Sequence, residues 1–372
     1  MDKRLLVTST ELMMVQFLVP HIKYLSQNGF KIDIACSNVG GRIEEVHATL
    51  APYTNKIFEL NLQRSPLSPK NFTGYKQLRK IFKENNYEIV WTNEPVMGVA
   101  TRLAARNARQ AGTKVLYMAH GFHFFKGAPF VNWMIYYPIE RFMARYADVI
   151  TCVNTEDFNR AKKFGVKQVK YIHGIGINTE RLTPKDGRRT SIKQELGLSE
   201  DDFVVLSVGE LNRNKNQKTI LKAIAELSNP KIHYILCGKG YEEPHLKELV
   251  QTLGITKNVH FLGYRRDVVD ICADADLYAM PSYREGLPVS SLEAMYCGLP
   301  LVTSDIRGLV DVNHPGRNGL LCSPSDHHGF AENIGKLYEN PSLRHKMAAA
   351  NRSDILPFTI SNTLTEVHNL LS

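Results

Sequence analysis

The sequence has no long apolar run, no dense cysteine pattern and no repeated or low-complexity tract. No stretch approaches the roughly 18 apolar residues of a membrane-spanning helix, which argues against such a helix. Near the first residue, the apolar run Leu5–Val7 is too short for the core of a secretory signal peptide. We therefore expect a globular protein that is located in the cytoplasm.

Cysteine is sparse, and the cysteines do not cluster. None of them has the spacing of a metal-ligand set, and most lie in apolar, strand-like surroundings. This pattern favours reduced thiols over a disulfide framework. The residues concerned are Cys36, Cys152, Cys237, Cys272, Cys297 and Cys322.

Length and charge point to two domains of different character. The chain has 372 residues, 43% of them apolar, which is long for one domain and sufficient for two cores. Residues 1–180 carry 24 Lys+Arg and 14 Asp+Glu, a net +10, whereas residues 181–372 carry 22 and 23, a net −1. A basic half suggests an acidic partner, which could be nucleic acid, anionic lipid or a phosphorylated substrate. Ordinary solubilising charge explains it equally well.

Both halves alternate strand-like runs with helical patterns, which is the arrangement of parallel sheets in α/β proteins. Expected strands of the first half are Arg4–Ser9, Lys31–Cys36, Ile57–Leu60, Ile89–Thr92, Val115–Ala119, Val149–Val153 and Val169–Ile172. Expected helices are Leu12–Gln27, Asn71–Asn85, Val96–Gln110, Val131–Tyr146 and Thr155–Phe164. Pro20 should kink or split the first of these helices.

The second half restarts the same alternation near Asp202. Expected strands are Phe203–Val208, Ile232–Cys237, Val259–Leu262, Leu277–Met280 and Leu301–Thr303, with helices near Asn216–Leu227, Glu243–Leu253, Asp267–Cys272 and Val289–Cys297. The charged, Pro- and Gly-containing segment Thr183–Ser191 is the expected linker. We therefore predict domains at 1–180 and 202–354, a linker at 181–201, and a helix at 355–372 that packs at the domain junction.

The stretch from Ser282 to Pro300 is the most informative. A short buried strand precedes it, and Pro288 suits the first position of a helix, where its missing N–H costs nothing. The chain should then run strand, tight loop, helix. Glu285 lies in that loop, and Glu293 lies about one and a half turns into the helix.

Backbone N–H groups near Gly286 and Leu287 would point into the crevice at the carboxyl end of the strand. Open α/β sheets bind ligands there, and helix N-termini attract phosphate. An anion-binding turn between two carboxylates suits a ligand that is part phosphate and part polyol, such as a sugar nucleotide. The alternative is a capped surface helix with two solvated glutamates.

The loop 208–216 follows the first strand of the second half and carries Arg213 and Lys215. An Arg fork and a Lys point charge can hold a diphosphate, although a solvated loop needs no function. The loop lacks the spaced glycines and the Lys-Ser/Thr pair of a P-loop.

Two further turns follow strands of the second half. Gly238 and Gly240 allow close backbone approach, but a dinucleotide fingerprint would need a third glycine. Tyr264 could stack against a flat base. Asp274 and Asp276 could bridge a divalent ion to a diphosphate, but they precede a strand, so a structural role is favoured.

In the first half, His120 ends a strand and could donate a hydrogen bond to a sugar hydroxyl or stabilise a transition state. A structural loop histidine is the alternative. The following stretch 128–137 is rich in aromatic residues and lies beside Lys126, Arg141 and Arg145. It could dip into a membrane interface or line a lipid-acceptor groove. A core helix needs fewer assumptions and is the favoured interpretation.

Taken together, these motifs resemble those of the retaining glycosyltransferases with two Rossmann-like domains, the GT-B architecture of family 4. The similarity is greatest to the bacterial exopolysaccharide and capsule branch. It rests on Glu285–Glu293, Gly298–Asp305, Asn318–Leu321, the block 120–125 and the loop Val208–Lys215. The resemblance implies an α/β fold of two doubly wound domains facing across a cleft, with a C-terminal helix that returns to the first domain.

The resemblance also implies roles for single residues. Glu285 would contact hydroxyls of the donor sugar and Glu293 the ribose, while the backbone at Gly286 and Leu287 would hold the diphosphate. Donor contacts are further expected from Gly238, Tyr264 and Pro288.

Lys215 matches the phosphate lysine of the family. Glu210 stands where relatives have an arginine, so Arg213 is the expected substitute. His120 matches a histidine near the reacting end of the donor sugar. The first loop, 8–12, lacks the usual glycine pair, which leaves the acceptor side poorly defined.

Cleavage of a sugar–phosphate bond builds negative charge on the departing diphosphate. Lys215, Arg213 and a helix N-terminus would stabilise that charge, so we expect no metal and no cofactor. The second domain has no evident nucleophile, so we expect front-face attack with retention of configuration.

The expected partners are a nucleotide sugar, with UDP-hexose or UDP-N-acetylhexosamine favoured by the resemblance, and a lipid-diphosphate-linked or oligosaccharide acceptor. The basic first half could contact the anionic inner face of a membrane. A sugar-nucleotide 2-epimerase is the alternative on the same architecture. A non-catalytic nucleic-acid binder is a weaker one, because the aromatics form no recognisable RNA-binding signature, and we expect no nucleic-acid partner.

Overall fold

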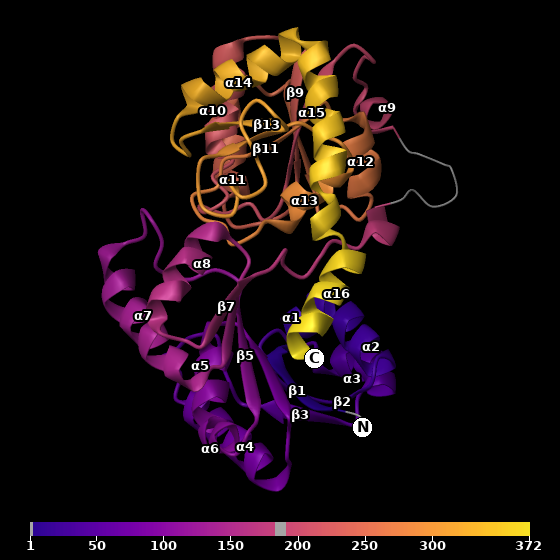
Figure 1. Cartoon of the computed structure of the whole chain (residues 1–372). Helices are drawn as coiled ribbons and strands as arrows, with labels where there is room; N and C mark the ends of the chain where they lie inside the picture. Colours follow the sequence, from indigo (N-terminus) through magenta and orange to yellow (C-terminus); the bar gives the residue numbers. More distant parts are fainter. Residues whose placement is uncertain (1–2, 183–190) are drawn as a thin grey trace. The chain divides into compact units, whose positions relative to one another are not determined.

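The computed structural model describes residues 3–182 and 191–372, and the chain divides into two compact units (Figure 1). The first unit comprises Met1–Gly176 together with Ile360–Ser372, and the second comprises Ile177–Thr359. The expected linker Thr183–Ser191 lies, except for Ser191, outside the described residues.

The first unit is built on a parallel sheet with the strand order β3-β2-β1-β4-β5-β6-β7. The central strands of this sheet, β1, β4 and β5, are almost entirely buried, because helices cover both faces of a parallel sheet. The strands are β1 (Lys3–Thr10), β2 (Phe30–Ser37), β3 (Lys56–Leu60), β4 (Ile89–Asn93), β5 (Lys114–Ala119), β6 (Val149–Cys152) and β7 (Gln168–Tyr171).

The helices of the first unit connect these strands in the doubly wound manner. They are α1 (Glu11–Met13), the π-helix η1 (Met14–Leu18), α2 (Val19–Gln27), α3 (Ile43–Leu50), η2 (Ala51–Tyr53), α4 (Lys70–Glu84), α5 (Pro95–Ala104), α6 (Arg106–Gln110), α7 (Phe130–Met143), η3 (Ala144–Tyr146), α8 (Thr155–Ala161), η4 (Lys162–Phe164) and α16 (Ile360–Leu371). The structure confirms the expected split at Pro20. The π-helix η1 ends at Leu18, and α2 begins at Val19 with Pro20 in its first turn.

The C-terminal helix α16 belongs to the first unit, as the resemblance implies. It packs on α2 and buries Thr363, Val367 and Leu371. Its last carbonyls, those of Leu370 and Ser372, accept hydrogen bonds from the ammonium groups of Lys114 and Lys3. Cations at a helix C-terminus are favourable because they meet its negative dipole end.

The second unit repeats the design with the order β10-β9-β8-β11-β12-β13. Its strands are β8 (Phe203–Val208), β9 (Ile232–Cys237), β10 (Val259–Gly263), β11 (Leu277–Met280), β12 (Leu301–Ser304) and β13 (Gly319–Cys322). Its helices are η5 (Thr179–Leu182), α9 (Ile192–Leu196), α10 (Lys218–Leu227), α11 (Glu243–Thr252), α12 (Val268–Asp274), α13 (Val289–Tyr296), α14 (His327–Glu339), α15 (Pro341–Asp354) and η6 (Leu356–Phe358). Successive residues of β8 enter two different cores, one on each face of the sheet.

The α/β fold of two Rossmann-like domains is therefore confirmed. Every strand expected from the sequence forms, within one residue at each end. Seven elements were not expected: α3, η2, η5, α9, β13, α14 and α15. The short helix α9, inside the region predicted as linker, belongs to the second unit together with η5.

One favoured interpretation is wrong: α7 is not a core helix. Only Glu140 and Met143 of this helix are buried. Six large apolar side chains of the helix are exposed, namely Phe130, Val131, Met134, Ile135, Ile139 and Phe142. The aromatic ring of Trp133 packs on the inner side against Phe124.

All six cysteines are free thiols, as expected, and four are buried. Among the helices of residues 3–182 and 191–372, none has both the length and the apolar character needed to cross a bilayer.

Candidate active site

The candidate site of the second unit lies where the strand order reverses. β8 and β11 are neighbours in the sheet, and the chain leaves them in opposite directions along it. Ligands of open α/β sheets bind at this switch point, beyond the carboxyl ends of the strands. The loop after β8 carries Lys215, and the loop after β11 carries Glu285. The fold therefore brings together two residues that are 70 positions apart.

Lys215 and Glu285 form a half-buried ion pair. The Lys215 Nζ lies 2.8 Å from Glu285 Oε1, and the two side chains are 21% and 12% exposed. The aliphatic part of the Lys215 side chain lies over Gly209. A Cβ atom added to this glycine would lie 3.5 Å from the Lys215 Cε atom. A cation and a carboxylate are thus fixed side by side, the pair of groups that a sugar diphosphate requires.

Side-chain amides and a hydroxyl hold the two loops in place. The Asn216 amide donates to the carbonyls of Pro281 and Pro324, at a backbone φ of 56° that is uncommon for a residue other than glycine. The Asn214 amide donates to the Arg284 carbonyl. The buried Tyr278 hydroxyl hydrogen-bonds Val208 and Ser290. These bonds tie the end of β8 to the segment that contains Glu285.

Arg307 is a further positioning residue that the sequence analysis did not identify. It is 6% exposed, and its Nε donates to the Glu285 carbonyl at 3.1 Å. The next residue, Gly308, has a φ of 80°, and a Cβ there would lie 2.3 Å from the Gly286 carbonyl oxygen. No local motif signals this role, because Arg307 is 22 residues from its partner.

α13 begins at Val289, with Pro288 as its N-cap, one residue earlier than the predicted role as first helical residue. Glu293 follows one turn later and is half-buried. Burial raises the pKa of its carboxyl above the usual range, and the charge of Arg181 only partly offsets this. A charged carboxylate that has lost its water lowers the stability of the folded protein. Its presence beside a ligand-binding edge is therefore typical of a functional site.

We predict that Glu293→Gln stabilises the protein at neutral pH and weakens donor binding. The folded state holds the Glu293 proton more tightly than the unfolded state, so wild-type stability falls as pH rises through the two pKa values. The calorimetric melting temperature of Glu293→Gln should therefore exceed that of the wild type increasingly from pH 4 to pH 7. Nucleotide-sugar affinity should fall about tenfold, as expected for loss of a hydrogen bond to a charged group.

The exposed Glu248 of α11 provides the control. Glu248→Gln should change neither stability nor donor affinity. An unchanged nucleotide-sugar affinity in Glu293→Gln would contradict the ribose role.

Arg213 is not brought to the Lys215–Glu285 pair. Its side chain is 85% exposed, and its Nε lies 3.2 Å from Glu242 Oε1 at the start of α11. Its backbone N–H contacts the Tyr241 hydroxyl. The expected diphosphate contact would require this guanidinium to leave Glu242.

The two other expected donor contacts lie in neighbouring turns at the same edge. Gly238 has a φ of 154°, and a Cβ there would lie 1.8 Å from the Gly209 carbonyl oxygen. The glycine thus allows two loops to pack together, which is a structural reason for its presence. Tyr264 follows β10 and is 72% exposed, with its ring open to a stacking partner.

Asp274 and Asp276 have structural partners at the opposite edge. Asp274 accepts the Ile192 backbone N–H, and Asp276 accepts that of Val204, at the amino ends of the strands. Both aspartates thus have the helix-end and strand-start partners that the structural interpretation expects.

In the first unit, His120 lies at the carboxyl edge beside the switch point between β1 and β4. Its Nε2 is 3.0 Å from Asn93 Oδ1, and the Asn93 amide faces the Thr8 carbonyl. Although part of its surface reaches solvent, burial lowers the pKa of the imidazole to about 4. His120 is thus neutral at pH 7, with Nε2 as the donor and Nδ1 as an acceptor for a hydroxyl.

Two carboxylates of this edge were not identified from the sequence. Glu94 has a φ of 67°, a strained conformation for a residue other than glycine, and accepts from Ser9 Oγ and the Thr10 N–H. Glu11, the first residue of α1, is fully buried and accepts a hydrogen bond from the Gly40 N–H.

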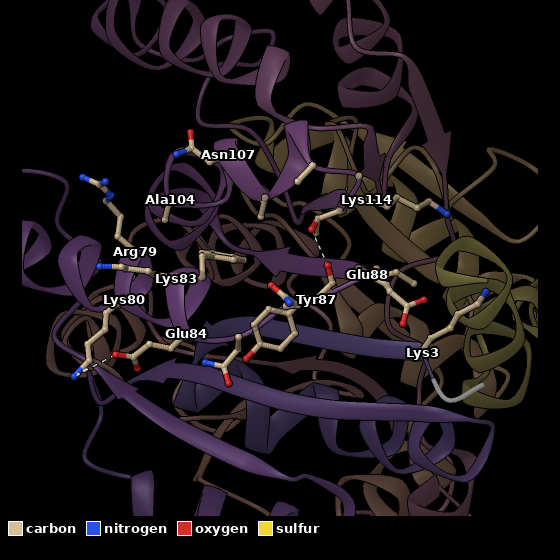
Figure 2. Close-up of a pocket in the computed structure, with 18 of the residues that line it drawn as sticks. Lys3, Arg79, Lys80, Lys83, Glu84, Tyr87, Glu88, Ala104, Asn107 and Lys114 are labelled. Carbon is tan, nitrogen blue, oxygen red and sulfur yellow. Dashed lines mark hydrogen bonds and ion pairs between the residues drawn. The ribbon is translucent and has the colours of Figure 1, made fainter.

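A large cavity of about 1380 Å³ lies at the other edge of the same sheet, beside the amino ends of β1, β4 and β5 (Figure 2). Figure 2 shows Lys3, Arg79, Lys80, Lys83 and Lys114 around it. Two of these cations hold the end of α16, as described above, and Lys80 pairs with Glu84. Parallel sheets bind ligands at the carboxyl edge, so we assign this cavity no part in catalysis.

Comparison with known proteins bears on the family of the chain. The family profile described as "Glycosyl transferases group 1" matches residues 188–354, and "Glycosyltransferase Family 4" matches residues 16–181. Among solved structures, HepE of Anabaena in complex with UDP superposes with a TM-score of 0.78, at 20% identity and 99% coverage of both chains.

Two curated relatives cover nearly the whole chain. An Escherichia coli UDP-Gal:α-D-GlcNAc-diphosphoundecaprenol α-1,3-galactosyltransferase is 27% identical, over 93% of this chain and 90% of its own. EpsD of Bacillus subtilis, itself assigned only provisionally as a glycosyltransferase, is 37% identical, over 96% of this chain and 92% of its own. With both family profiles matched, the chain belongs to the family 4-like glycosyltransferases of GT-B architecture.

Proposed function

We propose that this glycosyltransferase moves a hexose or N-acetylhexosamine from a UDP-sugar to a lipid-linked or oligosaccharide acceptor, with retention of configuration. The observation that carries this proposal is the Lys215–Glu285 pair at the switch point of the second sheet. In this proposal Lys215 neutralises the departing diphosphate, and Glu285 holds hydroxyls of the sugar.

We propose retention by front-face attack, because this reaction needs only positioning and charge and no nucleophile from the second unit. The diphosphate leaves towards Lys215 and the start of α13, and the acceptor hydroxyl attacks from the same face of the sugar and gives its proton to the departing diphosphate oxygen. The neutral Nδ1 of His120 is suited to accept a hydrogen bond from a sugar hydroxyl without adding positive charge.

The names of relatives support the choice of substrates. HepE was solved with UDP, and the E. coli relative is named for a UDP-galactose donor and a diphosphoundecaprenol acceptor. The resemblance of the sequence motifs to the exopolysaccharide and capsule branch leads us to propose a role in surface polysaccharide synthesis. A soluble donor and a lipid-linked acceptor would meet at the cytoplasmic face of the membrane.

The test is incubation of the full chain with a panel of UDP-, GDP- and ADP-sugars and lipid-diphosphate acceptors, with the anomeric configuration of the product read by NMR. An α-linked product from an α-linked UDP-sugar is expected. Conversion of the donor to its 2-epimer without acceptor would identify an epimerase instead, and an inverted product would overturn retention.

We further propose that transfer needs no metal ion, because the Lys215 ammonium lies beside Glu285 and can stabilise the diphosphate charge. Activity should persist, within about twofold, in excess chelator. Complete loss that manganese restores would contradict this, and would reopen the role of Asp274 and Asp276. Activity with added magnesium serves as the reference.

A further inference from the structure

A second cavity of about 650 Å³ lies in the first unit, between α4 and α7, and α5 forms its floor. Figure 1 shows α5 lying between these two helices. The volume falls within the range of roughly 300–1,000 Å³ that is typical of small-molecule sites. Unlike the basic cavity of Figure 2, this groove opens from the carboxyl edge of the sheet.

The lining of the groove changes character along its length. Most polar lining residues come from loops or strand ends at the carboxyl edge, namely Thr10, Ser37, Gln63, Arg64, Glu94 and His123, and Asn71 lies in the first turn of α4. The helices contribute an apolar floor and walls, including Val99, Ala100 and Leu103 of α5, Tyr75 of α4, and Ile135 and Ile139 of α7. The one carboxylate on the helical side, Glu140, is paired with Arg102.

The open side of the groove has an apolar rim. Leu67, Ile135 and Ile139 line the groove and are 91%, 47% and 43% exposed. The rim continues onto the outer face of α7 with Phe130, Met134 and Phe142, which are also exposed. Such a concentration of exposed apolar side chains marks a binding surface rather than an ordinary solvated face.

We propose that this groove binds the isoprenoid chain of a polyprenyl diphosphate acceptor, with the diphosphate at the polar end beside Arg64. This rests on the proposed function and identifies the acceptor class. A ligand with an anionic head and an apolar tail matches the change in lining from one end to the other. The head would then lie at the edge that carries His120 and Glu94.

Charge favours this occupant over a second copy of the chain. Residues 1–180 carry a net +10, α7 bears Arg141, and η3 directly after it bears Arg145. A two-fold contact through this face would place the same cations against one another. An anionic lipid neutralises them instead.

The test measures calorimetric binding of farnesyl diphosphate to the full chain in saturating UDP, which occupies the diphosphate site of the second unit. Val99→Trp fills the groove floor and should weaken binding at least tenfold. Leu103→Asn, which adds polarity without bulk, should weaken it about fivefold. Val131→Trp on the exposed face of α7, outside the groove, is the matched control and should change binding by less than twofold. UDP affinity should be the same in all variants.

Wild-type affinity for farnesyl diphosphate in both groove variants would overturn the proposal. The proposal would also be overturned if inorganic diphosphate bound as tightly as farnesyl diphosphate. A sedimentation experiment in which Val99→Trp by itself dissociates a dimer would overturn it too. If no nucleotide sugar supports transfer but the groove variants still lose farnesyl diphosphate, the groove assignment stands and the proposed function fails. If both groove variants transfer sugar to a lipid acceptor at the wild-type rate, the proposed function stands and the groove assignment fails.

Discussion

Lys215→Ala should lower the rate of sugar transfer by about 10²–10³-fold, the loss that follows removal of one group stabilising transition-state charge. It should also lower UDP affinity at least tenfold, because the lysine holds the diphosphate before and after reaction. Glu285→Gln should lower transfer to a similar degree but leave UDP affinity unchanged or higher. The reason is that the Lys215 ammonium, now paired with Glu285 at 2.8 Å, becomes available to phosphate.

Steady-state transfer assays and UDP titration calorimetry separate these two roles. Lys218→Ala is the matched control, since Lys218 is an exposed lysine three positions further along the chain, at the start of α10. It should change both quantities by less than twofold. A transfer rate near wild type in Lys215→Ala, or equal losses of UDP affinity in the Lys215 and Glu285 variants, would contradict the assignment.

The second large effect is on stability, at the buried ion pair between α5 and α7. The Arg102 Nη2 lies 2.8 Å from Glu140 Oε2, and the two side chains are 0% and 7% exposed. The Tyr117 hydroxyl donates to the other carboxylate oxygen. Arg102→Ala should lower the free energy of unfolding of the first unit by about 3–5 kcal/mol, because it leaves a buried carboxylate unpaired.

Tryptophan fluorescence in a denaturant titration reports this selectively, because both tryptophans, Trp91 and Trp133, lie in the first unit. Arg141→Ala on the exposed side of α7 is the control and should stay within about 0.5 kcal/mol of the wild type. Replacing the pair together, with Arg102→Met and Glu140→Leu, should recover most of the loss, since an apolar pair needs no desolvation of charge. A single Arg102→Ala variant as stable as the control would contradict the argument.

The sequence predicted the strands well because each is a short β-rich run bounded by turn residues. β13 was missed because Gly319–Cys322 begins with glycine, a residue that is unfavourable in strands. The nature of α7 could not be predicted, since apolar content does not reveal whether a partner covers it. Its exposed face became apparent only when the packing of α5 and α7 was known.

The site was predicted in part. The loops of Lys215 and Glu285 follow strands, and parallel strands end at one edge, so their proximity could be inferred. The direction of a loop side chain could not, and Arg213 turns to Glu242. Arg307 and Glu94 lacked any motif, because their roles depend on contacts with residues far away in the chain.

The position of α16 has a consequence for the order of events during synthesis. The first unit takes its last helix from residues that follow the entire second unit. While the ribosome is still translating, the face of α2 that packs against Thr363, Val367 and Leu371 has no cover. The second unit can therefore complete its fold earlier than the first, although it is made later.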